Sequence, residues 1–316
     1  MKHDKKSGAI IFVLIVVIAI AFALYKFFSG GIHFEFKKRE KNSRPFQKNY
    51  IAVLYVEGTI ESKNETYNQE WILETIEKIA DDEKNVSLVV FINSPGGSVY
   101  EADETYLALC DYAKKTQRPV YAYLASLAAS GGYYIACAAD EIYANRNTLT
   151  GSIGVIASQS VDASNLLEKL GIKMTTITAG KNKNMMNINS PLTDEQKDIM
   201  QSIADEAYEQ FTTIVSEARN LSIEKVRALA DGRIYSAAQA KKNKLIDDIK
   251  TWDEMQAMLE AKENDARFVS FRYEKKNPFD FIPFKFSLAT NIRETFSKFS
   301  KTFFPVMKYP AYLYVN

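Results

Sequence analysis

Histidine is almost absent from this sequence. Of its 316 residues only two are histidine, His3 and His33, and both lie beside the first apolar segment. Unless His33 folds back a long way, the body of the chain has no imidazole, which excludes a Ser-His-Asp triad and a histidine-rich metal site there. A serine nucleophile in this chain would therefore need a lysine, a carboxylate or a terminal amine as its base.

Cysteine is scarce and the net charge is close to zero. Cys110 and Cys137 lie in apolar surroundings and form no CxxC pair, which predicts two buried free thiols rather than a disulfide or a metal site. Lysine and arginine together number 40, against 39 aspartates and glutamates. This balance does not favour a nucleic-acid partner. We therefore expect no metal, no cofactor and no nucleic acid.

One long apolar run, from Ala9 to Leu24, stands near the start of the chain. It exceeds the apolar core of a cleaved signal peptide and predicts a single membrane-spanning helix, so that residues 1–28 form a cytoplasmic tail and a transmembrane anchor. Positive charges flank the run on both sides and do not fix its orientation. Because a short N-terminal tail usually stays in the cytoplasm, we expect the rest of the chain on the extracytoplasmic side of the cell membrane.

Composition divides the remainder into three parts. Residues 29–49 contain glycine, many charges and Pro45, which predicts a linker. Residues 50–262 carry the periodic apolar pattern of a folded domain. Residues 263–316 form a basic, aromatic-rich tail with apolar side chains at helical spacing, namely Leu288, Ile292, Phe296, Phe299 and Phe303. Such a helix could lie on an anionic membrane surface, pack on a neighbouring subunit or belong to an ordinary core.

Apolar strands alternate with helices through the central part. The predicted strands are 51–56, 86–92, 120–125, 141–144 and 173–178, and the predicted helices include 69–80, one after Gly97, 165–170, 236–242 and 252–261. Thr193 and Gln196 fit a capping box that opens a long helix, whose apolar face is Ile199, Ile203, Ala207, Phe211 and Ile214. Strands that are apolar throughout predict an α/β fold with a mainly parallel sheet covered on both faces.

The stretch from Ala128 to Tyr134 lies at one of the strand-to-helix junctions. Ser130 follows the apolar strand and precedes two glycines, so its hydroxyl would sit at a helix N-terminus with little steric shielding. The free N–H groups and the dipole of a helix N-terminus favour a developing negative charge. Ser130 is thus either a nucleophile or simply the N-cap of the helix.

Two further turns follow strands in the same way. Asn93–Gly97 ends with two glycines, whose N–H groups can turn inward without interference from a Cβ atom, and together with the Gly131 N–H they could form an oxyanion hole. Thr150–Ser152 offers a hydroxyl at a third turn. Because functional groups gather at the carboxyl ends of parallel strands, we expect these turns to meet.

The base is less well defined by the residues alone. A lysine accepts a proton only when it is neutral, which requires a pKa lowered by burial among apolar groups. Lys181 and Lys183 lie in a loop beyond a predicted strand, close to Met185 and Met186. Both could equally be solvated surface charges.

Four motifs in this order resemble the signal peptide peptidase A family, which contains membrane-anchored serine–lysine peptidases. They are Asn93–Gly97, Ala129–Tyr134, Thr150–Val155 and Gly232–Ala240. The resemblance covers residues 50–262. It implies the Clp/crotonase fold, a repeated ββα superhelix, in the short form with one catalytic unit behind one N-terminal transmembrane helix.

The resemblance also implies roles for individual residues. Ser130 matches the nucleophile, and Ser152 matches the serine that orients the lysine. Gly131 matches one oxyanion donor, and Gly96 or Gly97 matches the other.

The family's base lies in a Gly-x-Tyr-Lys-like motif that aligns with Gly180–Lys183 and selects Lys183. Asn182 stands at the aromatic position of that motif, and this departure leaves Lys181 as a rival. The implied activity is endopeptidase cleavage of remnant signal peptides and other hydrophobic peptides at the membrane lipid. Short-form relatives form homo-oligomeric rings with sites shared between neighbouring subunits.

Two other functions fit parts of the pattern. A non-catalytic membrane scaffold that binds hydrophobic peptides would keep the fold without a reactive lysine, and Asn182 is the feature that favours it. A crotonase-type acyl-CoA enzyme would also use paired glycine N–H groups on a carbonyl, but such enzymes usually rely on glutamates and rarely begin with a membrane anchor.

Overall fold

The structure is a computed structural model that describes residues 48–275. The predicted anchor, most of the predicted linker and the apolar pattern from Leu288 to Phe303 lie outside the described residues. Between residues 48 and 275, no helix is both long enough and apolar enough to cross a bilayer.

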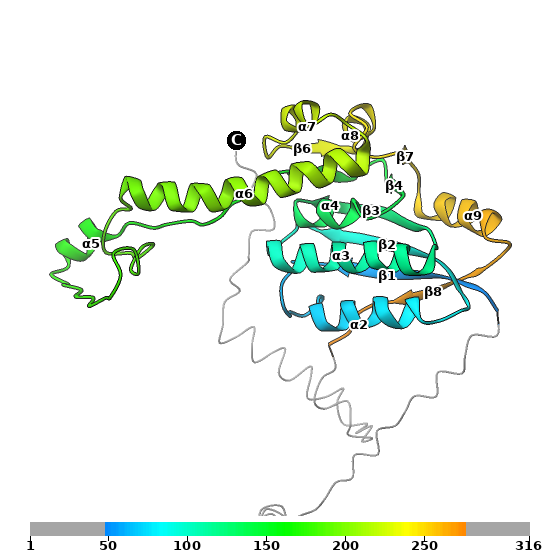
Figure 1. The fold of residues 1–316 in the computed structure, drawn as a ribbon, viewed down its shortest axis with the longest axis horizontal. Helices are drawn as coiled ribbons and strands as arrows, with labels where there is room; N and C mark the ends of the chain where they lie inside the picture. Colours follow the sequence, from blue (N-terminus) through cyan, green and yellow to red (C-terminus); the bar gives the residue numbers. More distant parts are fainter. Residues whose placement is uncertain (1–47, 276–316) are drawn as a thin grey trace, which may run out of the picture. The chain divides into compact units, whose positions relative to one another are not determined.

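Strands and helices alternate along the described chain (Figure 1). The strands are β1 (Tyr50–Glu57), β2 (Asn85–Ser94), β3 (Val120–Ala129), β4 (Glu141–Ala144), β5 (Leu149–Gly151), β6 (Ile234–Ser236), β7 (Asp248–Ile249) and β8 (Arg267–Phe271). The helices are α2 (Gln69–Ala80), α3 (Val99–Thr116), α4 (Gly131–Ala136), α5 (Ser164–Lys169), α6 (Asp194–Arg219), α7 (Ile223–Leu229), α8 (Ala237–Lys242) and α9 (Trp252–Lys262).

The strands form one sheet in the order β6-β5-β3-β2-β1-β8, and β4 pairs with both β3 and β7. All pairings are parallel except that of β5 with β6. The prediction of an α/β fold with a mainly parallel sheet is therefore confirmed. Because parallel strands share one carboxyl edge, the ends of β2, β3 and β5 lie together.

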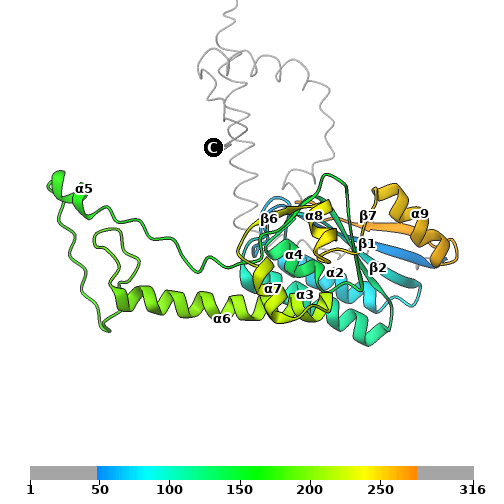
Figure 2. The same cartoon turned by 90° about the horizontal axis from the view of Figure 1, so that it is seen from above.

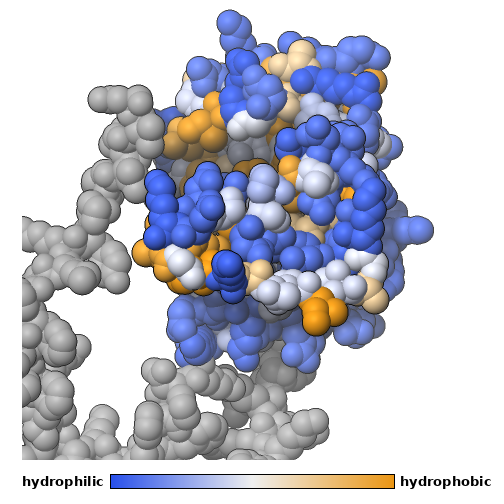
Figure 3. Space-filling model, turned by 90° about the vertical axis from the view of Figure 1, so that its left-hand side faces the viewer, coloured by the Kyte–Doolittle hydropathy of each residue, from blue (hydrophilic) through white to orange (hydrophobic). Residues whose placement is uncertain are grey.

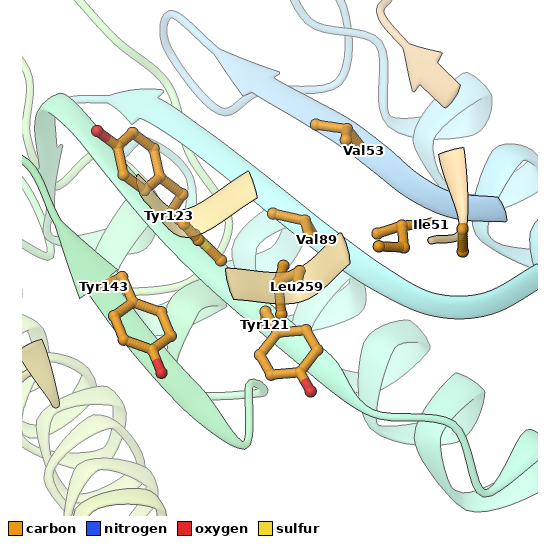
Figure 4. Packing of buried hydrophobic residues seen from close by; sticks show 9 residues of the cluster. Ile51, Val53, Val89, Tyr121, Tyr123, Tyr143 and Leu259 are labelled. Atoms are coloured by element: carbon orange, nitrogen blue, oxygen red, sulfur yellow. The ribbon is translucent and has the colours of Figure 1, made fainter. Parts of the chain in front are cut away.

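Helices cover the sheet on both sides, with α2, α3 and α4 on one face and α9 on the other (Figures 1 and 2). On the α9 face, aliphatic and tyrosine side chains from four strands pack around Leu259 (Figure 4). Ile51 and Val53 point to this face, and Ala52 and Leu54 alternate to the other; all four are buried. Both faces of the central strands are thus dry, as their unbroken apolar sequence predicts.

The predicted strand at 173–178 is wrong. These residues form no strand, and Ile177 is 95% exposed. An apolar run becomes a strand only when a sheet edge is available to pair with its backbone, and this run lies beyond the sheet.

Residues 157–203, which we name the arm, project away from the sheet in Figures 1 and 2. The arm contains α5, the following loop and the first part of α6, which begins at the predicted capping box of Thr193 and Gln196. The predicted apolar face of α6 is therefore buried only where the helix reaches the sheet: Phe211 and Ile214 are buried, whereas Ile203 on the arm is 50% exposed. Large apolar side chains of the arm are exposed, namely Val161, Leu166, Leu170, Ile172, Met174, Ile177, Ile188 and Ile203.

The packing of α9 gives a stability prediction. Leu259 is fully buried against the sheet, and Leu259→Ala is expected to lower the free energy of unfolding by about 2–5 kcal/mol, since it leaves a cavity. Leu107→Ala is the matched control, because Leu107 is also helical but 49% exposed; a change within about 0.5 kcal/mol is expected there. Denaturant unfolding measures both, and equal effects would contradict the assigned core.

Candidate active site

Ser130 occupies a strained turn between β3 and α4. Its backbone has φ 54° and ψ −122°, a conformation that L-residues rarely adopt. The turn is held because the Ser130 N–H donates to Gly151 O at 2.8 Å, and the Tyr134 N–H donates to Ser130 O at 2.9 Å. Its side chain caps no N–H of α4, so it is not the ordinary N-cap. Strain of this kind amounts to about 1–3 kcal/mol and is typical of functional turns.

The glycine turn after β2 lies directly against Ser130. Gly96 has φ +97°, and a Cβ atom added there would lie 2.7 Å from Gly131 N and 2.8 Å from Ser130 Cβ. Only glycine permits this approach. The two turns therefore form one packed unit.

The two candidate donors of this turn differ in their hydrogen bonds. The Gly96 N–H donates to Ser94 Oγ at 3.0 Å. The bridge to Ile60 uses Gly96 O and the Ser98 N–H, so in a parallel pattern the Gly97 N–H points to the opposite side. Gly97 N lies 3.4 Å from the position that a Gly131 Cβ would take. The geometry thus favours Gly97 over Gly96 as the partner of Gly131.

Ser152 is brought beside Ser130 by the short strand β5. Ala129 is paired with Gly151 in the β3–β5 ladder, and Ser152 follows immediately. Ser152 has φ 50°, and its N–H donates to Arg233 O at 2.8 Å. The segment before β6 therefore fixes the turn at Ser152, in the same way that β5 fixes the turn at Ser130.

The three turns open onto one cleft of about 520 Å³. Ser130, Ser152 and Gly97 line it together with the apolar side chains of Val99, Val155, Ile156 and Ala230. The predicted meeting of the three turns is therefore observed. Tyr208 and Asp231 also line the cleft. The sequence does not indicate either residue, because neither the residue pattern of α6 nor that of the turn at 231–233 shows which side chains will line the cleft.

Cys137 is not a rival nucleophile, although it lies seven residues after Ser130. Burial raises the pKa of the Cys137 thiol to about 12, so it stays protonated at neutral pH. The thiolate, not the thiol, is the reactive form. Within residues 48–275, no three histidine, cysteine or acidic side chains gather as a metal site would require.

The two candidate lysines are not in this cleft. Lys181 and Lys183 lie in the loop of the arm between α5 and α6, and both are exposed. The Lys181 ammonium forms an ion pair with Glu195, which also accepts from Asn182 at 3.1 Å. Lys183 forms no ion pair among the described residues. One chain therefore brings together the serine, the hydroxyl of Ser152 and the glycine turn, but neither lysine.

Several known proteases are similar in sequence to this chain. The sequence pattern described as Peptidase family S49 matches residues 112–266. A protein provisionally named signal peptide peptidase SppA, from Enterococcus faecium, is 36% identical over 70% of this chain and 67% of its own length. A provisionally named protease from Methanocaldococcus jannaschii is 31% identical over 81% of both chains.

Other relatives are longer than the part that aligns. Protease 4 from Haemophilus influenzae is 35% identical over 65% of this chain, which corresponds to 34% of that protein. Among solved structures, a ClpP1 mutant from Listeria monocytogenes matches with a TM-score of 0.43 and 18% identity, over 64% of this chain and 94% of that one.

The site is thus a cleft at the edge of an α/β sheet, with a serine in a strained turn and backbone N–H groups beside it. The chain belongs to peptidase family S49. Its enzymatic class is that of a serine protease, and the predicted resemblance to signal peptide peptidase A is confirmed.

The contact between the two glycine turns gives a direct prediction. Gly96→Ala is expected to lower peptidase activity by at least about a hundredfold, since the methyl group displaces Ser130 and the Gly131 N–H from their positions. Gly171→Ala is the control, because Gly171 also has positive φ but no atom within 4 Å of the added Cβ. Cleavage of a synthetic apolar peptide, with circular dichroism to check folding, measures both. Wild-type activity in Gly96→Ala would contradict the assigned site.

Proposed function

We propose that this protein is a membrane-anchored serine–lysine endopeptidase that degrades remnant signal peptides. Ser130 is the nucleophile, Lys183 of a neighbouring copy is the general base, and Ser152 orients that lysine. The N–H groups of Gly97 and Gly131 form the oxyanion hole. The finer fold is the repeated ββα superhelix of the Clp/crotonase class, and the catalytic part lies on the extracytoplasmic side of the cell membrane.

The observation that carries this proposal is the strained Ser130 turn in a cleft shared with Ser152 and Gly97. Ser130 is held with positive φ at the carboxyl edge of the parallel sheet, where it lines the open cleft. In the packed pair of turns beside it, Gly97 N lies close to Gly131. Preorganised donors of this kind stabilise the negative charge of a tetrahedral intermediate.

The position of the arm supports a base supplied by another copy. Lys183 belongs to the arm, which projects away from the sheet (Figures 1 and 2), and it is not among the described residues that line the cleft. The arm exposes a series of large apolar side chains, and the end of the molecule seen in Figure 3 shows hydrophobic residues among hydrophilic ones. Exposed apolar side chains in such number are typical of a surface that another protein covers. A second copy, whose cleft lacks a base, is the partner that this arrangement needs.

Lys183 is favoured over Lys181 for a local reason. The Lys181 ammonium forms an ion pair with Glu195 of its own chain, so Lys181 would have to leave this partner before it could enter another cleft. A general base must be neutral before it accepts a proton. Lys183 has no such partner among the described residues and can enter an apolar cleft when copies assemble.

The reaction then follows from the positions of these groups. The neutral lysine amine takes the proton of the Ser130 hydroxyl, and the serine oxygen attacks the peptide carbonyl. The resulting oxyanion accepts hydrogen bonds from the Gly97 and Gly131 N–H groups. The lysine ammonium passes its proton to the leaving amine, and water then hydrolyses the acyl-enzyme while the lysine again acts as base.

The cleft supports an apolar peptide as substrate. Its aliphatic lining, Val99, Val155, Ile156 and Ala230, suits small or medium apolar side chains. The glycine turn at Gly96–Gly97 offers backbone groups beside which an extended peptide could add as a strand. Signal peptides have an apolar central segment, and a relative of this chain carries the name signal peptide peptidase.

Four full-length proteins, purified in detergent, test the catalytic roles. Wild type is expected to cleave a synthetic signal peptide, whereas Ser130→Ala and Lys183→Ala are expected to lose activity by at least about a thousandfold, since each removes a group that acts in the bond-breaking step. Lys181→Ala should keep most activity. Cleavage is followed by mass spectrometry of the products.

Each other outcome has a defined meaning. An inactive Lys181→Ala with an active Lys183→Ala would move the base by two residues. An active Ser130→Ala would contradict the mechanism, and cleavage of a thioester by that variant would favour acyl-CoA chemistry. A wild type that binds the peptide without cleaving it would favour the scaffold.

A further inference from the structure

One buried hydroxyl joins the three helices that carry the parts of the proposed site. Tyr134 of α4 donates from its hydroxyl to Asp103 Oδ1 of α3 at 2.6 Å. The same oxygen accepts from Gln210 Nε2 of α6 at 2.7 Å. The Tyr134 hydroxyl therefore has one donor bond and one acceptor bond, each to a different helix.

Each of these helices begins or ends at a different part of the site. Helix α3 starts just after Gly97, and α4 starts just after Ser130. Helix α6 runs from the arm, which carries Lys183, back to the sheet (Figure 1). Tyr134 thus lies where the oxyanion turn, the nucleophile and the lysine-bearing arm are tied together.

The surroundings make this contact well defined. Tyr134 is only 5% exposed, and its ring packs against Phe211 of α6 at 5.0 Å and Tyr106 of α3 at 5.5 Å between ring centroids. Burial, followed by the nearby Asp103 carboxylate, raises the pKa of Tyr134, so the phenol stays protonated and keeps its donor bond. A bond from a neutral phenol to a carboxylate is stronger than one between neutral groups.

The ring contacts and the hydroxyl contacts of Tyr134 restrict α6 in different ways. The rings of Tyr134 and Phe211 meet at a tilt of 51°, and such an apolar contact does not by itself fix α6 at one position, because burial of apolar surface is largely non-directional. The bond from Gln210 fixes one point along α6 relative to α4. Since α6 extends well beyond this point, a small rotation at Gln210 becomes a larger displacement at the tip of the arm.

We propose that the Tyr134 hydroxyl is a positioning group that fixes the direction in which α6 leaves the nucleophile helix, and thereby the place where the arm presents Lys183 to the next copy. This role rests on the proposed function, in which the lysine acts between copies. Tyr134 touches neither substrate nor reacting atoms and acts through the arm.

Mixed assemblies test this role because they separate the two contributions of a chain. A full-length Lys183→Ala chain supplies the serine, and a full-length Ser130→Ala chain supplies the lysine. The two are co-expressed with different tags, purified over both tags in detergent, and assayed for kcat and KM on a synthetic apolar peptide. Tyr134→Phe is then added to one chain or to the other.

The expected result is asymmetric. Tyr134→Phe in the lysine-supplying chain is expected to lower kcat by about tenfold with little change in KM, because the base is misplaced while the cleft is intact. In the serine-supplying chain the loss should stay below about twofold. Gln210→Ala should give the same asymmetry, since it removes the contact from the side of α6.

Tyr133→Phe is the matched control. Tyr133 is the neighbouring residue of α4, fully buried, and its hydroxyl donates to Leu245 O at 2.7 Å rather than to α6. The same hydroxyl deletion on the same helix should lower thermal stability without asymmetry in kcat.

Several results would overturn the role. Equal losses in both chains, no loss in either, or the same asymmetry in Tyr133→Phe would show that Tyr134 contributes only to stability. A parent mixture of Lys183→Ala and Ser130→Ala without activity would refute the base between copies and the positioning role together. An active parent mixture with symmetric variants would refute the positioning role alone.

Discussion

The hydrogen bond from the Ser130 N–H to Gly151 O is the constraint on which the site depends. It holds a non-glycine residue in a conformation that the isolated chain would avoid, and it does so because β5 pairs with the end of β3. Gly96 approaches the same turn so closely that no side chain fits there. The strain is thus maintained by the parallel sheet, whose packed faces supply the stability that one unfavourable turn requires.

The candidate site residues of one chain are thus divided between a preformed cleft and a separate arm. The cleft contains Ser130, Ser152 and the glycine turn at Gly97, all placed by strand ends of one sheet. The lysines lie on an arm whose large apolar side chains are left exposed by the described part of the chain, residues 48–275. Under the proposed function, the base of each cleft comes from a second copy, so peptide cleavage would depend on assembly.

Much of the fold can be predicted from local chemistry. Unbroken apolar runs identify β1, β2 and β3, and the Thr193–Gln196 capping box fixes the start of α6. Ser130 and its two partner turns can be predicted because glycine and strand ends mark them directly. The arm cannot be predicted in this way. The sequence pattern shows that Ile177 and Ile203 are apolar, but it does not show whether other parts of the chain bury them. The wrong strand at 173–178 has this cause. Tyr208 and Asp231 are missed for another reason, since the spacing of the sequence does not indicate which side chains line the cleft.

In the proposed mechanism, Lys183 of one copy reaches Ser130 of another. Single variants Ser130→Cys and Lys183→Cys, co-expressed at full length with tags of different mass, test it with a short bismaleimide that joins two thiols. We expect a cross-linked dimer that carries both tags. It should be absent when wild type, whose cysteines are Cys110 and Cys137, receives the same treatment. Cross-linking found only within the single chain of a Ser130→Cys/Lys183→Cys double variant would contradict it.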